Sequence, residues 1–122
     1  MQTSKQLKGT RGEQLAKQYL QKQGLKYIAS NWSCKVGEVD IIMHDPADDT
    51  RVFVEVRLRA PTQFGQGFET VARQKQTKLI RAAQYYQLKE DYWGHLRFDV
   101  ISIIDVPNSS PEIEYIKDAF TL

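Results

Sequence analysis

Two runs of this sequence decide its fold: Gly37-Glu38-Val39-Asp40-Ile41-Ile42 and Phe53-Val54-Glu55-Val56-Arg57. Each run is rich in β-branched residues, which are typical of strands. The break between them, residues 44–51, contains Asp45-Pro46, a pair that favours a turn. The pattern therefore predicts a β-hairpin. Both of its strands carry carboxylates where a strand needed only for folding would carry apolar side chains.

The carboxylates of the two runs are expected to meet. Side chains alternate between the faces of a strand, so Glu38 and Asp40 should share one face of the first run. Glu55 and Arg57 should share one face of the second run for the same reason. Neighbouring side chains on paired strands lie about 5 Å apart, which lets Asp40 approach Glu55. Two carboxylates beside a cation indicate a divalent-metal site for phosphodiester chemistry.

Each of these acids also has a purely structural interpretation. A buried carboxylate without a partner costs several kcal/mol, on the order of the penalty for any isolated buried charge. An ion pair between Glu55 and Arg57 or Arg59 would remove that cost. Asp40 would then be only a polar residue close to the turn at Gly37. Finding both acids on facing strands favours the metal site.

The rest of the chain alternates helices and strands. Helices are predicted over residues 10–23 and 70–88, and strands over 27–35, 36–43, 51–56 and 96–104. A loop is predicted over residues 59–69, and an acidic tail over 107–122 with a short edge strand at Glu112–Ile116. This order favours an α/β fold, with a mixed central sheet flanked by helices. At 122 residues the chain should form one domain over residues 1–122, with a core at 8–105 and a C-terminal tail at 106–122.

Composition excludes several classes of protein. No apolar run approaches the roughly 20 residues that span a bilayer, so no membrane partner is expected. The polar start, residues 1–8, lacks the apolar segment of a secretory signal. A single cysteine, Cys34, cannot form an internal disulfide and is typical of the reducing cytoplasm. Cys34 is better explained as a small half-buried residue than as a nucleophile. A homodimer stays an open alternative.

The net charge of +2 hides an uneven distribution. Residues 1–35 hold seven basic side chains and one acid, and residues 71–89 hold five basic side chains and no acid. Such an asymmetry favours a polyanionic partner, although two solvated helix faces would also explain it. The candidate nucleic-acid-binding residues lie on the second predicted helix and are Arg73, Gln74, Lys75, Lys78 and Arg81.

Two further side chains have two interpretations each. Glu13 lies at the margin of the apolar stripe of the first helix and could point towards the sheet. It could equally complete a capping box with Thr10. Lys75 falls in register with the apolar residues Leu79 and Tyr86, so it could reach past the end of the sheet towards a phosphate. It could also extend to solvent.

The motifs resemble those of the YraN family, small bacterial proteins with a restriction-endonuclease-like fold that are related to Holliday-junction resolvases. The resemblance runs from about Gly9 to Ile104. It rests on Gly12-Glu13 with Ala16, on the two runs quoted above, and on Arg97-Phe98-Asp99-Val100. It implies the α-β-β-β-α-β core of the PD-(D/E)XK nucleases.

The resemblance also implies roles for particular residues. Asp40 and Glu55 would be metal ligands, Glu13 the acid of the first helix, and the Val56 carbonyl a further ligand for Mg²⁺ or Mn²⁺. The position of the superfamily's lysine falls on Arg57, which stays protonated and cannot act as a general base. Arg57 can still hold a phosphate through two hydrogen bonds, and a divalent cation can activate water without a lysine.

The sequence thus predicts a metal-dependent endonuclease that acts on DNA, including branched or structured DNA. The main alternative is a nucleic-acid-binding module that keeps the nuclease fold with little or no catalysis. An adaptor whose basic faces contact a protein is a third interpretation.

Overall fold

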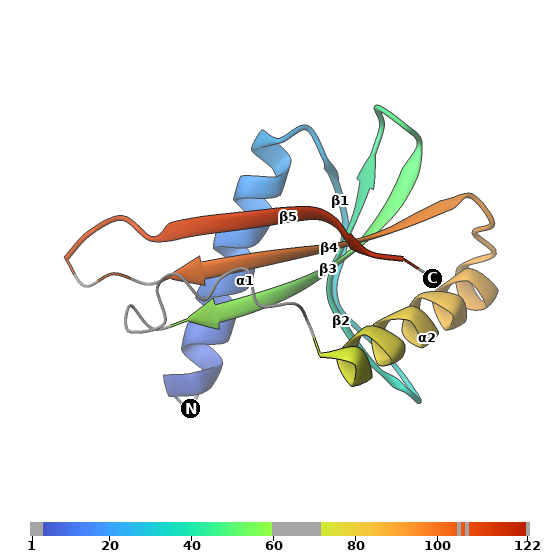
Figure 1. The fold of residues 1–122 in the computed structure, drawn as a ribbon, viewed down its shortest axis with the longest axis horizontal. Coiled ribbons are helices and arrows are strands. Elements are labelled where there is room, and N and C mark those ends of the chain that lie inside the picture. Colours follow the sequence, from blue (N-terminus) through green and yellow to red (C-terminus); the bar gives the residue numbers. More distant parts are fainter. Residues whose placement is uncertain (1–3, 60–71, 105, 107, 122) are drawn as a thin grey trace.

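A computed structural model describes residues 4–59, 72–104, 106 and 108–121, with side chains from residue 11 onward. Within these ranges the chain forms two helices and five strands (Figure 1). The elements are α1 (Ser4–Lys22), β1 (Lys26–Cys34), β2 (Gly37–Asp45), β3 (Thr50–Arg59), α2 (Arg73–Glu90), β4 (His95–Ile104) and β5 (Glu112–Phe120). The predicted order of helices and strands is confirmed. The predicted loop at 59–69 lies outside the described residues, except for Arg59, which ends β3.

The five strands form one mixed sheet in the order β1-β2-β3-β4-β5. Strands β3 and β4 are parallel, and the other neighbouring pairs are antiparallel. A parallel pair needs a long crossover connection, and α2 lies on the stretch of chain that provides it. The predicted α/β fold, with a mixed sheet flanked by helices, is therefore confirmed.

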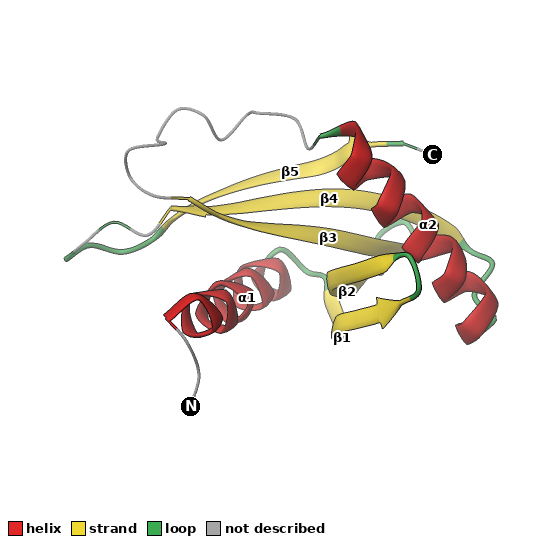
Figure 2. Cartoon of the chain, turned by 90° about the horizontal axis from the view of Figure 1, so that it is seen from below, coloured by secondary structure: helices red, strands yellow, loops and turns green. Residues whose placement is uncertain are grey.

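The two helices cover different faces of this sheet (Figure 2). On the face of α1, Ala16 and Leu20 pack against Ile41, Val54 and Ile101. On the face of α2, the helix residues Leu79, Ala82, Ala83 and Tyr86 pack against Val39, Ile42, Phe53 and Phe98. Successive residues of β3 belong to different clusters because strand side chains alternate between faces. The buried area of both clusters provides the main driving force for folding.

Helix α1 is longer than predicted. It begins at Ser4 rather than at Thr10, so Thr10 lies inside the helix and the capping box with Glu13 is wrong. The polar residues before Thr10 give no apolar periodicity from which that first part could be predicted. The predicted end, residue 23, lies within one residue of the observed end at Lys22, and Gly24 follows the helix with a φ of 96°, which glycine adopts readily.

The C-terminal segment is also more ordered than predicted. Strand β5 extends to Phe120 instead of ending at Ile116, and it pairs with β4 along its length. Tyr115 packs on the α1 side of the sheet, and Phe120 stacks on Phe98 with ring centroids 5.2 Å apart. These contacts on both faces hold the strand in the sheet. Of the described helices, none is long and apolar enough to cross a membrane.

Candidate functional site

The site lies where β2 separates from β3. The two strands pair from Asp45↔Thr50 to Ile41↔Val54, and no paired residue follows that last pair. Immediately beyond it, the Asp40 side chain replaces the ladder, because the Val56 N–H donates a 2.8 Å hydrogen bond to Asp40 Oδ2. The predicted hairpin is confirmed, and it brings Asp40 next to the strand that carries Glu55.

Strict alternation along β2 is interrupted at this point. Val39 packs in the core beneath α2, whereas Ile41 packs in the core beneath α1, although the two residues are two apart. The simple alternation that placed Glu38 and Asp40 on one face therefore does not hold through Asp40. Glu38 is exposed and Asp40 is half-buried. The turn of the backbone lets the Asp40 carboxylate reach the Val56 amide.

The surroundings of Asp40 favour its protonated form. Burial is the largest cause, followed by the negative charge of Glu55, and smaller contributions come from Glu13 and Glu38. The hydrogen bond from Val56 opposes them, and the net effect raises the pKa of Asp40 to about 7. The carboxylates of Glu13 and Glu55 are therefore close enough to act on that of Asp40, and we call these three residues the acid cluster.

Two polar neighbours hold the other members of the acid cluster. Lys75 Nζ, from the first turn of α2, lies 3.2 Å from Glu55 Oε1. The Glu55 side chain is 16% exposed and that of Lys75 is 66% exposed. Asn31 Nδ2 donates a 3.0 Å hydrogen bond to Glu13 Oε2, so Glu13 points towards the sheet. Asn31 has a φ of 53°, an uncommon backbone conformation for a residue within a strand.

Arg57 and Val56 complete this region of β3. Arg57 is half-buried beside Ser102 of β4, two residues beyond Glu55 on the same strand. Val56 faces the core on the α1 side while its amide is bound by Asp40. The backbone of Val56 is thus fixed by the Asp40 carboxylate.

The basic residues of α2 lie on its solvent side. Arg73, Gln74, Lys75, Lys78 and Arg81 are all exposed, whereas Leu79, Ala82 and Tyr86 are buried as predicted. Of the five, Lys75 is the residue with a hydrogen bond into the acid cluster. The other four extend from that end of α2 along the helix.

The donor set suits a hard cation, although the described residues contain no group of three or more His, Cys, Asp or Glu side chains placed to hold one. Asp40 and Glu55 provide two carboxylates next to a fixed backbone segment. Oxygen ligands of this kind are those that Mg²⁺ and Mn²⁺ prefer. In this conformation Glu13 is bound to Asn31, and Lys75 neutralises part of the charge of Glu55.

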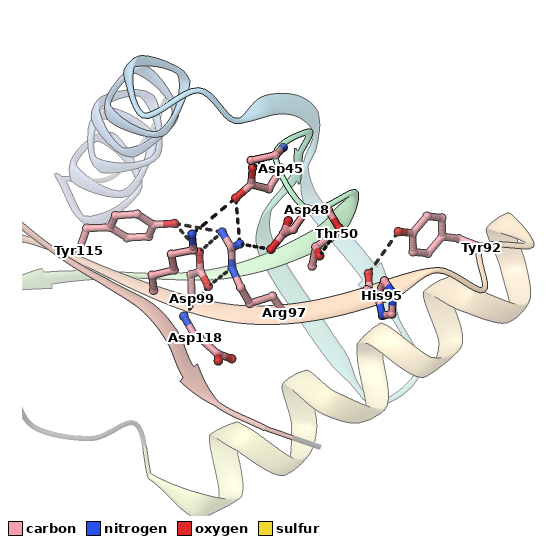
Figure 3. Close-up of polar contacts among 11 residues, drawn as sticks. Asp45, Asp48, Thr50, Tyr92, His95, Arg97, Asp99, Tyr115 and Asp118 are labelled. Carbon is pink, nitrogen blue, oxygen red and sulfur yellow. Dashed lines mark hydrogen bonds and ion pairs between the residues drawn. The ribbon is translucent and has the colours of Figure 1, made fainter.

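A second polar network was missed by the sequence analysis (Figure 3). Asp99 is fully buried, and its carboxylate accepts hydrogen bonds from Arg97 Nε (3.0 Å) and the Asp118 N–H (2.9 Å). Tyr115 also donates to Asp99, and Arg97 Nη1 lies 2.9 Å from Asp45 Oδ2. We call Asp45, Arg97, Asp99, Tyr115 and Asp118 the β4 network. The sequence does signal part of it, because Arg97 and Asp99 are two residues apart and therefore lie on the same face of a strand.

The β4 network is electrostatically satisfied. Burial is the largest single effect on Asp45 and works against its charged form. The hydrogen bonds from Arg97 and the Ala47 N–H, with the charges of Arg97 and Lys117, together outweigh burial and lower the pKa of Asp45. Burial and the Asp99 carboxylate both raise the pKa of Tyr115, which therefore stays a hydrogen-bond donor. Each buried charged group of the network has a partner, so the network joins the end of the hairpin to β4 and β5 rather than offering a binding site.

Comparison with known proteins gives consistent matches over nearly the whole chain. A family model described as "Uncharacterised protein family UPF0102" matches residues 12–103. A UPF0102 protein of Pseudomonas syringae pv. syringae (strain B728a) is 42% identical over 120 residues, covering 97% of this chain and 96% of the relative. Another, from Pseudomonas savastanoi pv. phaseolicola (strain 1448A / Race 6), is 45% identical with the same coverage.

Proposed function

The chain belongs to UPF0102, the YraN family, and on that footing we propose that it is a metal-dependent endonuclease that acts on DNA. Branched or otherwise structured DNA is included in the proposed substrate class. The observation that carries the proposal is the environment of Asp40. A half-buried carboxylate with a pKa of about 7, beside Glu55 and fixed by the Val56 amide, is typical of a functional rather than a structural acid.

The acid cluster has the donors for one divalent cation. Asp40, Glu55 and the Val56 carbonyl would hold Mg²⁺ or Mn²⁺, with Glu13 able to join from α1. Such a cation would act as a Lewis acid that stabilises charge on a phosphodiester and favours the attack of water. The cation would also offset the repulsion that raises the pKa of Asp40.

Two basic side chains have separate roles next to the acids. Arg57 remains protonated, so it would hold a phosphate oxygen and would not take a proton from water. Lys75 is the amine at the site, 3.2 Å from Glu55. It would orient Glu55 and stabilise charge on the phosphate.

Helix α2 provides the surface on which the DNA backbone would lie. Arg73, Gln74, Lys78 and Arg81 are exposed along the same helix whose first turn reaches Glu55 through Lys75. Lysine and arginine side chains bind phosphates in a sequence-independent, salt-dependent way. One strand of DNA bound there would run into the acid cluster.

The decisive experiment is a cleavage assay on duplex, flap and four-way-junction DNA, with Mg²⁺ or Mn²⁺ and with EDTA. We expect cation-dependent cleavage by the parent protein and its loss in Asp40→Ala and Glu55→Ala. Glu38→Ala is the matched control, because Glu38 is an exposed acid next to the site. Cleavage by both site variants at the parent's rate would contradict the proposal.

A binding module with little catalysis is the second candidate. Arg57 stands where the superfamily has lysine, and that observation favours it. Arg57→Lys separates the two functions, since a gain of cleavage indicates an impaired nuclease and no change favours binding alone. Binding that weakens steeply with salt would in turn exclude a purely protein-binding adaptor.

We place this activity in the cytoplasm, where a single free cysteine is normal. Nucleic acid, and DNA above all, is the proposed partner. A homodimer would allow two sites to act on the two strands of a structured substrate.

A further inference from the structure

One flank of α2 changes character along its length. Residues spaced by three or four lie on the same side of a helix, and Gln74, Lys78, Arg81, Tyr85 and Leu88 follow that spacing. The first three are polar or basic and exposed. The last two are apolar and also exposed, at 42% for Tyr85 and 68% for Leu88. The flank therefore begins as a polar, basic surface and ends as an apolar one.

Trp93 lies just after α2, two residues beyond Asp91, and is another exposed aromatic residue at the same end of the helix. It is 64% exposed, and together with Leu88 it is the most exposed large hydrophobic residue in the described part of the chain. We call Tyr85, Leu88 and Trp93 the aromatic end of α2. Apolar side chains gathered in this way on a protein surface often mark a binding site.

The Trp93 side chain is held in a fixed orientation although it is exposed. Its indole N–H donates a 2.8 Å hydrogen bond to Asp91 Oδ1. Asp91 ends α2 with a φ of 51°, and its own N–H is bound to the Gln87 carbonyl. An aromatic ring that is fixed before binding loses little conformational entropy when a second ring stacks on it.

We propose that the aromatic end of α2 stacks on unpaired nucleobases of a nucleic acid whose phosphates lie on Lys78 and Arg81. The inference rests on the DNA binding of the proposed function and adds the substrate feature that is recognised. Bases present uncharged faces to aromatic rings, and their stacking is independent of sequence. The local charge favours a neutral base there, because the acids Glu90 and Asp91 outnumber the single basic residue Lys89 next to the aromatic end and so disfavour a phosphate.

The length of the helix gives the position of the unpaired base relative to the cut. Tyr85 follows Lys75 by ten residues, which corresponds to about 15 Å along a helix. Leu88 is about 20 Å from Lys75 on the same scale. With about 3.4 Å of helix axis for each nucleotide, the stacked base is about four to six nucleotides from the phosphate beside Glu55.

The test measures binding without cleavage, in EDTA. Three fluorescent DNAs are compared: a short blunt duplex, the same duplex with a single-stranded extension, and the duplex with an extension of abasic nucleotides. The last two carry equal numbers of phosphates and differ only in their bases. We expect the parent protein to bind the base-bearing extension about tenfold more tightly than the abasic one, as stacking of one base predicts.

Variants test whether the aromatic end of α2 causes the preference for the base-bearing extension. Trp93→Ala and Tyr85→Ala should each remove most of the tenfold preference and leave binding to the blunt duplex unchanged. Tyr27→Ala is the matched control, because Tyr27 is 37% exposed and its ring contacts Lys17 of α1, the helix on the other face of the sheet. Lys78→Ala with Arg81→Ala should weaken binding to all three DNAs. Trp93 is largely exposed, so its variant should unfold at the parent's Tm.

The outcomes separate the two proposals. Equal binding to the base-bearing and abasic extensions, or a preference that survives both aromatic variants, would overturn the stacking surface while DNA binding stands. In that case the aromatic end would be left as a surface for a protein partner. Failure to bind any of the three DNAs would overturn both proposals at once. Loss of metal-dependent cleavage without loss of the preference would affect the nuclease proposal alone.

Discussion

Asp40 joins structure and chemistry in one side chain. Its carboxylate accepts the Val56 N–H, which fixes the point where β2 leaves β3. Burial and the charge of Glu55 raise its pKa to about 7, so near neutral pH the proton is readily lost. Keeping the hydrogen bond and losing the proton are separate properties, and a single isosteric substitution distinguishes them.

The first prediction concerns Asp40→Asn and pH. The pKa of Asp40 is higher in the folded protein than its ordinary value of 3.8, so the folded state binds the proton more tightly. The free energy of unfolding of the metal-free parent should therefore fall as pH rises from about 4 to about 7, by at most about 1.4 kcal/mol per pH unit. Asparagine keeps the acceptor for Val56 and has no proton to lose.

Urea unfolding in EDTA at several pH values measures this effect. Asp40→Asn should gain stability relative to the parent as pH rises through that window, and the difference should level off above about pH 7. Glu90→Gln should follow the parent, since Glu90 is an exposed acid at the C-terminal end of α2 and does not contribute to the pKa of Asp40. Parallel curves for the parent and Asp40→Asn would show that the folded protein does not perturb Asp40.

At the scale of elements, β4 is held to its neighbours by polar groups as well as by its ladder. Asp99 is fully buried and takes hydrogen bonds from its own strand and from β5. Arg97 reaches in the other direction, to Asp45 at the end of β2. A buried network of this kind stabilises only while each member has its partner.

The second prediction compares two tyrosines. Tyr115→Phe removes a donor to the buried Asp99 carboxylate and should lower the free energy of unfolding by about 1.5–3 kcal/mol, the usual range for a hydrogen bond to a charged group. Tyr27→Phe is the matched control, because Tyr27 donates to Ser30 at the exposed surface. Its cost should be below about 0.5 kcal/mol. Equal losses in urea unfolding would show that Asp99 does not depend on Tyr115.

On the scale of the whole molecule, the acid cluster lies where four elements meet. Helix α1 contributes Glu13, β2 Asp40, β3 Glu55, and α2 the lysine that pairs with Glu55. These elements come from both faces of the sheet. Each helix packs on its own face of the sheet through its own hydrophobic cluster. A cation bound at the acid cluster would connect these two layers.

The third prediction is that Mg²⁺ or Mn²⁺ stabilises the folded protein. A ligand that binds only the native state raises the free energy of unfolding by about 2.7 kcal/mol at a hundredfold excess over Kd, so Tm rises with the concentration of the ligand. The effect should be larger at about pH 8 than at about pH 6, because the cation competes with the proton on Asp40. A thermal shift in Asp40→Asn with Glu55→Gln equal to that of the parent would place the cation elsewhere.

The hairpin and its acids could be predicted from the sequence because their signals are local. The runs rich in β-branched residues predicted β2 and β3. The carboxylates inside those runs identified Asp40 and Glu55 as candidate site residues. The contact of Lys75 with Glu55 and that of Asn31 with Glu13 could not be predicted, because they depend on how helices cross the sheet. Whether a cation binds stays a prediction.

Other features were missed for the same physical reason. Two partners of Asp99, Tyr115 and Asp118, lie on β5, and Asp45 is far from Arg97 in the sequence. Strand β5 was underestimated because it lies at the edge of the sheet, where half-buried residues give a weak apolar pattern. The early start of helix α1 was not predicted, because its first residues are mostly polar and show no apolar periodicity.

The burial of Asp99 also imposes an order of events while the chain is being made. Synthesis proceeds from residue 1 onward, so β4 leaves the ribosome before Tyr115 and Asp118 exist. During that interval Arg97 alone can neutralise the Asp99 carboxylate, and β4 is an open edge that other nascent chains can pair with. The addition of β5 closes this edge and completes the shell around Asp99. We expect the period before that closure to be when the nascent protein is most prone to aggregate.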